Sequence, residues 1–470
     1  MSEQDAQPRM VRFPEDFSMG QVTVEVREGD DWRWLEWMPA RGDVAVPVGC
    51  RLSLHWGRLE QDGLSSLEAL GSDDLYAFST HKFWRGPANE LAHLSRLTGL
   101  RKLSLGYEMF YLTAEGATHL EGLCNLEQLS VGATDDEALG HVRHLSALKR
   151  FGPSGIRVTD AGLPYLAQLR NLEALYLSDT GITDAGLPYL AQLRNLETLH
   201  LAETKITGSG LFHLADLPKL TELDLSSTKV TGERLVGIPG MARLRGLNLY
   251  GTHLTSRSLQ FLTRLSELRA LDLDDTRLEG AALRNLVGLS ELESLSASNN
   301  RIDNRSLPAV GALYNLRRLR LNNTRIDLAG LQALGDLTAM EALAISRTGI
   351  NDNSLEGLVG MRNLKSLWLS DTAILGEGLS HLAGHSALND LWLDHTALED
   401  SSLVYLRALP GLRHLILSDT RISDAGLPHL TALASLGYLA LHNTAVTGAG
   451  VATLRQALPN CKIGVGTTRQ

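Results

Sequence analysis

The feature of this sequence that most restricts its fold is a leucine pattern that returns every 24 residues. Residues 171–196 illustrate it, reading NLEALYLSDTGITDAGLPYLAQLRNL. The unit has the form L-x-x-L-x-L-x-x-T-x-I-x-x-x-x-L-x-x-L-x-x-L-x-x. Its first position recurs without slippage at Leu148, Leu172, Leu196, Leu220, Leu244, Leu268, Leu292, Leu316, Met340, Leu364, Leu388, Leu412 and Leu436. A register kept this strictly predicts stacked structural repeats.

The repeats extend beyond the regular units at both ends. Two less regular units begin at Leu100 and Leu126, and a further strand follows Leu436, with Ile463 and Val465 at its fourth and sixth positions. At the front, Leu75 and Phe78 indicate one partial strand. The sequence therefore predicts about 15 units plus terminal strands over residues 75–466. Residues 1–11 and 467–470 are expected to be tails, the first of them disordered.

Each position of the unit has a physical reason. Positions four and six are two apart, so both face the same side of a short strand, and strands of successive units are expected to pair in parallel. The spacing of three in L-x-x-L-x-x-L suits a short helix or 3-10 turn. The Thr at position nine, replaced once by Asn300, can bond buried backbone groups. Asp or Ser after the next Thr, as in Thr183–Asp184, is expected to cap the helix.

This pattern resembles the leucine-rich-repeat family, and its TDAGL segment is similar to 24-residue bacterial units and to the repeats that follow F-boxes. The resemblance covers roughly residues 75–466, and no F-box-like helical segment precedes it. It implies an α/β solenoid with a curved parallel sheet on the concave face and short helices or 3-10 turns on the convex face. Bacterial leucine-rich-repeat ubiquitin ligases carry a large catalytic domain with a Cys, but Cys461 has only a short stretch after it.

Residues 12–74 precede the repeats and alternate like strands, in QVTVEV, DWRWLEWMP, DVAVP and RLSLHW. Five of the seven tryptophans lie in the first 90 residues, at Trp32, Trp34, Trp37, Trp56 and Trp84. We interpret this segment as a β-rich N-terminal cap whose rings build its core, because an open solenoid needs its ends covered. A separate small ligand-binding domain is the alternative.

Composition excludes several kinds of partner. The formal charge is −10 and basic residues are scattered, which argues against nucleic acid and against an anionic membrane surface. The three cysteines, Cys50, Cys124 and Cys461, form no CxxC pair, so we expect no metal site, disulfide framework or cofactor. Without a signal-peptide pattern or an apolar span, we expect a cytoplasmic protein, although non-classical secretion stays open. We also expect the protein to be monomeric.

Binding information is expected at the positions that face out from the strands. The residue at position five varies from unit to unit, which suits a recognition surface on a rigid frame. Trp368 and Trp392 occupy it in successive units, so their strands should place them about 5 Å apart. Exposed paired tryptophans favour an interface, unless the two rings merely stack on each other. The predicted partner-binding residues are Trp368, Trp392, Asp371, Asp394, His395, His414, Ile416, Tyr176, Asp272 and Arg320.

One group of acidic residues has both a functional and a simpler structural interpretation. An acidic group of Glu222, Asp224, Asp272, Asp274 and Asp275 could hold a basic segment or a cation, but strands spread its oxygens apart, and a solvated face is the simpler interpretation.

Histidines offer two further candidates. His395 and His414 near Asp394 are interpreted as a chance placement rather than a metal or acid–base site. His381 and His385 lack the HExxH glutamate, and His385 is expected to pack where other units carry Leu or Met.

No nucleophile elbow, phosphate loop, dinucleotide fingerprint or kinase motif is present, so catalysis is not expected. The sequence predicts a non-enzymatic interaction scaffold that binds a protein on its concave face. The alternatives are carbohydrate or glycopeptide binding on the Trp368 and Trp392 platform, or a substrate adaptor in ubiquitin-type turnover or host targeting.

Overall fold

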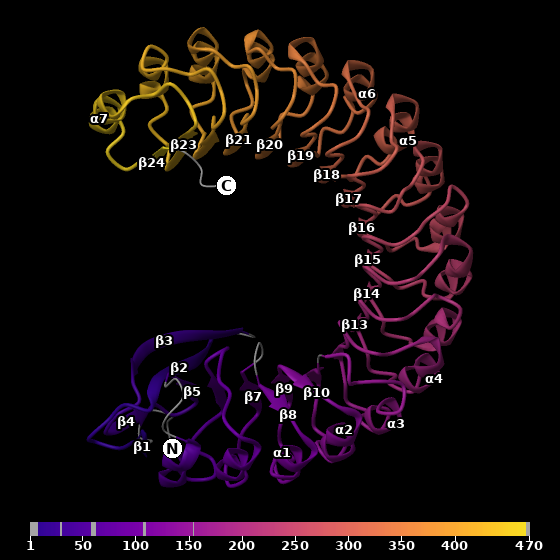
Figure 1. The fold of residues 1–470 in the computed structure, drawn as a ribbon, viewed down its shortest axis with the longest axis vertical. Coiled ribbons are helices and arrows are strands. Elements are labelled where there is room, and N and C mark those ends of the chain that lie inside the picture. The colour runs from indigo at the N-terminus through magenta and orange to yellow at the C-terminus, as the bar shows by residue number, and fades with distance from the viewer. Residues whose placement is uncertain (1–7, 29–30, 58–62, 107–109, 154, 467–470) are drawn as a thin grey trace. The chain divides into compact units, whose positions relative to one another are not determined.

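The computed structural model describes residues 8–28, 31–57, 63–106, 110–153 and 155–466. The chain divides into two compact units, Met1–Lys229 and Val230–Gln470, which we describe separately. In both, short parallel strands stack one repeat after another, with the helices on the opposite side of each repeat (Figure 1). A leucine-rich-repeat solenoid was predicted, and this prediction is confirmed.

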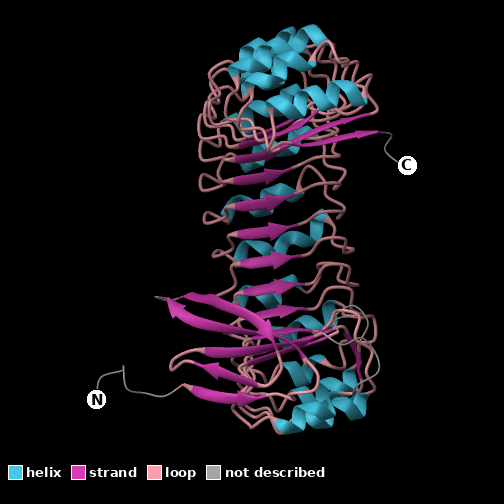
Figure 2. Cartoon of the chain, turned by 90° about the vertical axis from the view of Figure 1, so that its left-hand side faces the viewer, coloured by secondary structure: helices cyan, strands magenta, loops and turns pink. Residues whose placement is uncertain are grey.

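Unit 1 begins with antiparallel strands. Strand β2 pairs with β3 on one side and β5 on the other, while β1 pairs with β4 in a separate two-stranded sheet. Figure 2 shows these longer strands beside the short arrows of the repeats. Their bounds are β1 Arg9–Arg12, β2 Gly20–Glu28, β3 Asp31–Pro39, β4 Asp43–Val46 and β5 Arg51–Trp56.

Parallel pairing starts at β5 and continues through the repeats of unit 1 in the order β5, β6, β7, β9, β11, β12, β13, β14. Strands β8 and β10 form a small parallel pair of their own. The bounds are β6 Ala77–Thr80, β7 Lys102–Leu105, β8 Tyr111–Leu112, β9 Gln128–Val131, β10 Ala133–Thr134, β11 Arg150–Gly152, β12 Ala174–Tyr176, β13 Thr198–His200 and β14 Glu222–Asp224.

Unit 2 is one parallel ladder, in which each strand pairs with the next in sequence order. Its strands are β15 Gly246–Asn248, β16 Ala270–Asp272, β17 Ser294–Ser296, β18 Arg318–Arg320, β19 Ala342–Ala344, β20 Ser366–Trp368, β21 Asp390–Trp392, β22 His414–Ile416, β23 Tyr438–His442 and β24 Lys462–Gly466. Direct Cα partners are 24 residues apart from β15 to β24, as in Leu367 and Leu391, so the register is the one that the sequence spacing predicts.

The segment after each strand turns back as a short helix, as the spacing of three predicts. The α-helices are α1 Ala114–Thr118, α2 Asp136–Val142, α3 Leu163–Leu166, α4 Leu187–Leu190, α5 Leu307–Gly311, α6 Leu328–Ala333 and α7 Gly448–Ala457. The 3-10 helices are η2 Leu64–Ala69, η3 Ala88–Leu94, η4 Asp184–Gly186, η5 Leu211–Asp216, η6 Gly232–Gly240, η7 Ser258–Arg264, η8 Gly280–Leu286, η9 Asn304–Ser306, η10 Asp352–Leu358, η11 Glu377–Leu382, η12 Asp400–Ala408 and η13 Leu427–Ala432.

Leucines of the strands and helices fill the space between them, and nearly all are fully buried. The Thr at position nine lies in this core and donates to the carbonyl three residues earlier, as Thr180 Oγ1 does to Leu177 at 2.7 Å. Asn300 does more, because its amide donates to three carbonyls and its oxygen accepts from Leu278 N–H at 2.8 Å. The predicted role of position nine in satisfying backbone groups is confirmed.

Position eight adopts the left-handed backbone in one unit after another, with φ between 52° and 57°. The non-glycine residues found there are Asp179, Glu203, Ser227, Asp275, Asn299, Asn323, Arg347, Asp371, His395, Asp419 and Asn443. Asp, Asn and His are enriched in this conformation, so the residue types at Asp371 and His395 suit the turn whatever they bind.

The helix caps differ from the sequence prediction. Thr183 itself is the N-cap and accepts from Ala185 N–H, whereas Asp184 reaches into the next unit. Its carboxylate accepts from Thr207 N–H and Oγ1, at 2.9 and 2.6 Å, and from two further backbone N–H groups. Asp184 therefore joins successive units rather than capping its own helix.

Two expectations for the N-terminus need correction. Residues 1–7 lie outside the described part of the chain, but Arg9–Arg12 form β1, so order begins before residue 12. Trp56 and Trp84 are buried at 2% and 5% exposure, whereas Trp34 and Trp37 are 54% and 49% exposed. The rings therefore do not all build a core. The side chain of Trp32 lies outside the described residues.

Candidate functional site

We use the name strand face for the side of the sheet to which positions three and five point. In unit 2 it is the inner side of the arc (Figure 1). Position five on β19 to β23 is apolar throughout and is occupied by Ala344, Trp368, Trp392, Ile416 and Ala440, which are successive Cα partners. The alanines are buried under 6%, Trp368 and Ile416 are half-buried, and Trp392 is 40% exposed. This row is the apolar centre of the candidate site.

The two indoles lie close together without stacking in parallel. Their ring centroids are 6.5 Å apart and the ring planes are tilted by 54°. The predicted side-by-side placement of Trp368 and Trp392 is therefore present, and the alternative in which each ring covers the other is only partly realised, because Trp392 keeps its exposure.

Position three carries a hydrogen-bonded polar row beside the tryptophans. Ser366 Oγ donates to Asp390 Oδ2 at 2.8 Å, and His414 Nδ1 lies 2.5 Å from Asp390 Oδ1. The carboxylate accepts from both neighbours, which fixes the tautomer of a neutral His414 with the proton on Nδ1. Nucleophilic catalysis would need serine bonded to the imidazole instead, so this row does not form a catalytic triad.

Residues at the carboxyl ends of the same strands are held by local bonds. Asp394 accepts from Ser370 Oγ at 2.6 Å, and Asp371 forms an ion pair with Arg347 at 3.3 Å. His395 Nε2 lies 3.5 Å from Asp419, which makes an ion pair when the imidazole is protonated. These groups border the tryptophans with carboxylates that are engaged by neighbouring side chains.

Seven of the ten predicted residues therefore gather on β20 to β22 and the turns that follow them. The other three do not join this cluster. Arg320 is exposed on β18 and Asp272 lies on β16, both in unit 2. Tyr176 belongs to unit 1, where its ring meets that of His200 edge-on at 4.9 Å. Sequence reasoning missed Ser366 and Asp390, although their place at position three was a sufficient signal for the strand face.

The acidic group is divided between the two units. Glu222 and Asp224 belong to unit 1, and Asp272, Asp274 and Asp275 belong to unit 2. The Asp274 carboxylate is bonded within unit 2, because it accepts from Ser296 Oγ at 2.7 Å and from Ser298 N–H at 2.5 Å. No group of three or more His, Cys, Asp or Glu side chains within the described ranges could hold a metal ion.

His385 is a packing residue, as predicted, and is fully buried. Its Nδ1 lies 3.0 Å from the carbonyl oxygen of Leu382 and its Nε2 lies 3.1 Å from that of Leu358. Both ring nitrogens therefore contact backbone carbonyl oxygens, and neither nitrogen is available to bind a ligand.

Unit 1 carries a second aromatic group on its strand face. Trp37 stacks on His55 with ring centroids 5.4 Å apart and planes 13° apart, and Trp34 lies 5.1 Å from Trp37. His55 is anchored by Thr23 Oγ1 at 3.3 Å and Ser79 Oγ at 2.9 Å. Burial lowers the pKa of His55, and the nearby Glu25 carboxylate opposes this shift.

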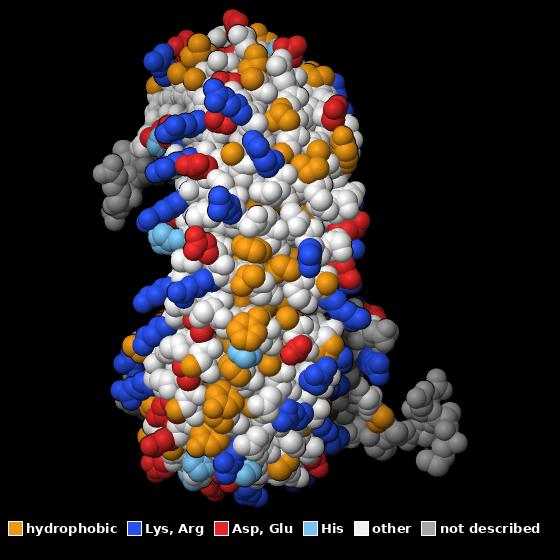
Figure 3. Space-filling view, turned by 90° about the vertical axis from the view of Figure 1, so that its right-hand side faces the viewer, with side chains coloured by type: hydrophobic (Ala, Val, Ile, Leu, Met, Phe, Trp, Pro, Cys, Tyr) orange, Lys and Arg blue, Asp and Glu red, His pale blue; other side chains and the backbone are white. Residues whose placement is uncertain are grey.

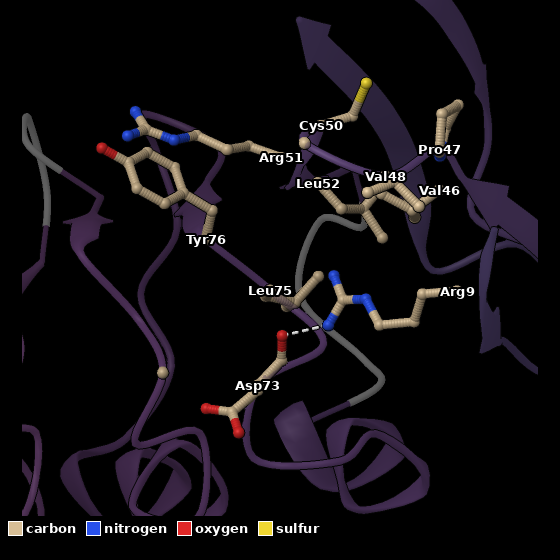
Figure 4. Close-up of a pocket in the computed structure, with 12 residues that line it drawn as sticks. Arg9, Val46, Pro47, Val48, Cys50, Arg51, Leu52, Asp73, Leu75 and Tyr76 are labelled. Atoms are coloured by element: carbon tan, nitrogen blue, oxygen red, sulfur yellow. Dashed lines mark hydrogen bonds between the residues drawn. The ribbon is translucent and has the colours of Figure 1, made fainter. Parts of the chain in front are cut away.

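A cavity of about 340 Å³ lies where the β1–β4 pair meets the first repeat strands (Figure 4). Arg9 reaches across it to the backbone carbonyls of Asp73 and Asp74 and pairs with the Asp74 carboxylate at 3.6 Å. Burial raises the pKa of the Cys50 thiol on its wall. Arg9 therefore fastens the N-terminal strands to the repeats, and this gap is a packing feature.

On the helix side, apolar side chains are interrupted by charged and polar ones (Figure 3). In unit 2, Val236 lies in η6, Val287 directly follows η8 and Tyr314 lies shortly after α5, at 66%, 49% and 68% exposure. Scattered exposed apolar residues of this kind are normal on a protein surface. No helix in the part of the chain described here is long and apolar enough to cross a bilayer.

Comparisons with known proteins agree with this fold. Residues 170–230 match the family model described as leucine rich repeat. An internalin of Listeria monocytogenes is similar at 25% identity and a TM-score of 0.53, covering 64% of this chain and 82% of the internalin. A leucine-rich-repeat protein of Leptospira interrogans is similar at 18% identity and a TM-score of 0.60, covering 87% of this chain and 99% of its own.

No curated protein matches the chain significantly in sequence. The register of 24, the buried Thr and Asn of position nine and the similar solved structures together show the fold. The chain is a leucine-rich-repeat solenoid, and its residues 170–230 match the leucine-rich-repeat family model.

Proposed function

We propose that this protein is a non-enzymatic scaffold that binds a protein partner on the strand face of unit 2, centred on Trp368 and Trp392. Leucine-rich-repeat proteins generally mediate protein–protein interaction, and their fold is typically non-enzymatic. The observation that carries the proposal is the tryptophan pair itself, with Trp392 40% exposed at a position that is outside the core.

Burial of the exposed rings supplies the main driving force for binding. A tryptophan that loses its water contact on binding contributes a large apolar area, and tryptophan is enriched among interface hot spots. Ile416 extends the apolar row on one side, and Asp390 with His414 provides oriented polar groups on the other. This combination of an apolar centre and a polar rim is typical of protein interfaces.

Rigidity adds to the affinity. The strands are fixed by the parallel ladder, and Asp390, Asp394 and His414 are held by bonds to their neighbours. Side chains already in their bound arrangement lose little conformational entropy when a partner docks. The surface therefore does not need to reorganise to bind.

The test uses the full chain, immobilised to recover a saturable partner, which is then purified. We expect the Trp368→Ala, Trp392→Ala double variant to bind it at least about a hundredfold more weakly, because a loss of about 1.4 kcal/mol at each ring is tenfold and the two losses multiply. Tyr314→Ala removes a still more exposed ring, 68% against 40% for Trp392, from the helix side of unit 2 and should leave affinity unchanged.

Two outcomes would reject the proposal. The first is a double variant that binds the purified partner as tightly as the wild type. The second is a glycan array bound by the wild type and lost by the double variant, with no saturable protein partner, which would assign the same platform to carbohydrate.

A further inference from the structure

Unit 2 contains a hollow on the flank of the repeats, between the strand ends and the helices. Its volume is about 800 Å³. We call it the lateral hollow and define it by its lining residues Asp352, Leu375, Glu377, Glu399, Tyr405 and Arg421. Its lining residues come from the units that begin at Met340, Leu364, Leu388 and Leu412, and the middle two of these carry Trp368 and Trp392.

Leu375 departs from the residue pattern of the repeat. It occupies position twelve, which is polar in all the other regular units, at Thr159, Thr183, Thr207, Thr231, Thr255, Glu279, Asp303, Asp327, Asn351, Glu399, Ser423 and Thr447. Several of these side chains accept from helix N–H groups, as Thr183 and Asn351 do. A leucine cannot do this, and Leu375 is 62% exposed to solvent. Its side chain therefore serves neither the cap nor the core.

The backbone beside Leu375 is satisfied from the preceding unit. The Asp352 carboxylate accepts from the N–H groups of Leu375, Gly376 and Gly378, at 2.8, 2.8 and 2.7 Å. The Asp184 carboxylate makes the equivalent bonds beside Thr207, so these three backbone N–H groups are satisfied whichever residue stands at position twelve. The fold tolerates the leucine without using it, which points to a contact made by its side chain.

A second row of backbone hydrogen bonds, which joins successive units after the strands, is interrupted beside Leu375. In the units on either side, the N–H of position ten bonds the carbonyl of position eleven in the preceding unit, as Ala373 does to Ile350 at 2.9 Å and Arg421 to Leu398 at 3.0 Å. Across the described residues, Ala397 and Ile374 make no such bond. Within the described residues, the bond is also missing between Arg277 and Leu254, and the hollow lies at one of these two interruptions.

The charges around the hollow favour a basic occupant. Glu399 is already paired with Arg421 at 3.1 Å, and Asp352 is occupied by backbone N–H groups. Glu377 is exposed, and no ion pair or side-chain hydrogen bond engages its carboxylate within the described ranges. A lysine or arginine placed there would gain an ion pair without breaking one.

Two residues that line the hollow follow Trp368 and Trp392 within the same two units of the chain. In one unit, Trp368 at position five is followed by Asp371 at the turn and by Leu375 at the hollow. The next unit repeats this order with Trp392, His395 and Glu399. An extended segment lying across the tryptophans would therefore reach the lateral hollow by passing over Asp371 and His395.

We propose that the lateral hollow is a second contact site for the protein partner, receiving an extended segment with an apolar side chain against Leu375 and Tyr405 and a lysine or arginine against Glu377. This rests on the proposed function for the partner being a protein. It goes further by assigning the chemistry of the segment and a surface away from the strand face.

The probe is a library of random 12-residue peptides displayed on phage and selected against the full chain. We expect enriched peptides to carry a lysine or arginine next to a large apolar residue. Leu375→Thr restores the residue most common at position twelve, so it should fold normally while weakening a synthesised peptide about tenfold, the loss expected for one buried leucine contact. Glu377→Gln should weaken it about threefold, and less at high salt.

Val287→Thr is the matched control, because it makes a similar exposed apolar-to-Thr change in unit 2, 49% exposed and outside the hollow. The proposal is overturned if no peptide is enriched, or if Leu375→Thr binds the enriched peptides as tightly as Val287→Thr does.

The tryptophan variants separate this proposal from the proposed function. If the Trp368→Ala, Trp392→Ala variant loses the partner while Leu375→Thr and Glu377→Gln keep it, only the lateral hollow is wrong. If Leu375→Thr and Glu377→Gln weaken binding while the tryptophan variant does not, the hollow stands and the strand-face proposal falls.

Discussion

Trp368 and Trp392 are direct Cα partners on adjacent parallel strands, and their rings meet at a tilt of 54° rather than face to face. Parallel stacking would have hidden both inner faces, whereas the tilt leaves Trp392 40% exposed. A ring held by its neighbour but still open to solvent is suited to binding, because its position is fixed and its surface is free.

Asp184 should contribute to the stability of unit 1 through its bonds to the next repeat. Asp184→Asn replaces one carboxylate oxygen with an N–H₂ group that faces other donors, so we expect a loss of about 1.5 kcal/mol in the free energy of unfolding, measured in urea. Asp179→Asn, at an exposed turn position, removes the same charge and should cost much less. Equal losses in the two variants would contradict this role.

The same carboxylate should make unit 1 sensitive to acid. Burial raises the pKa of Asp184, but hydrogen bonds from Thr207, Gly210 and Gly208 together lower it by more than burial raises it. The net pKa therefore lies below the ordinary 3.8. Its stabilisation is complete above pH 3.8 and is lost as the pH falls through the lowered folded pKa. In acid titrations of stability, the wild type should approach Asp184→Asn at low pH, and a constant gap between them would be inconsistent with this linkage.

His55 should give unit 1 a second pH dependence, at a higher pH. Its folded pKa is lowered from 6.5, first by burial, so the unfolded chain binds the proton more readily. Stability is therefore constant above pH 6.5 and falls as the pH drops from there toward the folded pKa. His55→Gln cannot titrate, and melting curves from about pH 7.5 to about pH 5 should show a smaller decline than in the wild type. An identical decline would assign the effect elsewhere.

His385→Leu should stabilise unit 2. A neutral imidazole has one N–H, yet both ring nitrogens of His385 lie within 3.1 Å of carbonyl oxygens, so one contact sets lone pair against lone pair. Leucine at this position is the rule in other units, as Leu337 and Leu409 illustrate, and both are buried. Calorimetry should show a gain of about 1 kcal/mol. A lower melting temperature would mean that the two carbonyls need the histidine.

Sequence arithmetic predicted the strand register and therefore the pairing of Trp368 with Trp392, because a spacing of 24 leaves no freedom in which residues are neighbours. It did not predict the bonds of Asp390 with Ser366 and His414, because a register gives the face of a side chain and not its rotamer. The interruption of the flank ladder at Leu375 was likewise invisible until the backbone bonds were known.

The N-terminal strands were harder to predict for a related reason. Trp34 and Trp37 are three residues apart, so simple alternation would place them on opposite faces of β3. The register between β2 and β3 shifts at Val24 and Glu25, and this bulge brings both rings to one face. No residue pattern in the segment signals the bulge, so the expectation of rings packed in a common core was wrong for these two.

The most direct test of the account is the dissociation constant of the purified partner for Trp392→Ala and Trp368→Ala, taken singly, beside Tyr314→Ala. We predict losses of tenfold or more for both tryptophans, about 1.4 kcal/mol each at least, with the larger loss at the more exposed Trp392, and no change for Tyr314→Ala. Wild-type affinity in both tryptophan variants would contradict the claim that unit 2 binds its partner through this pair.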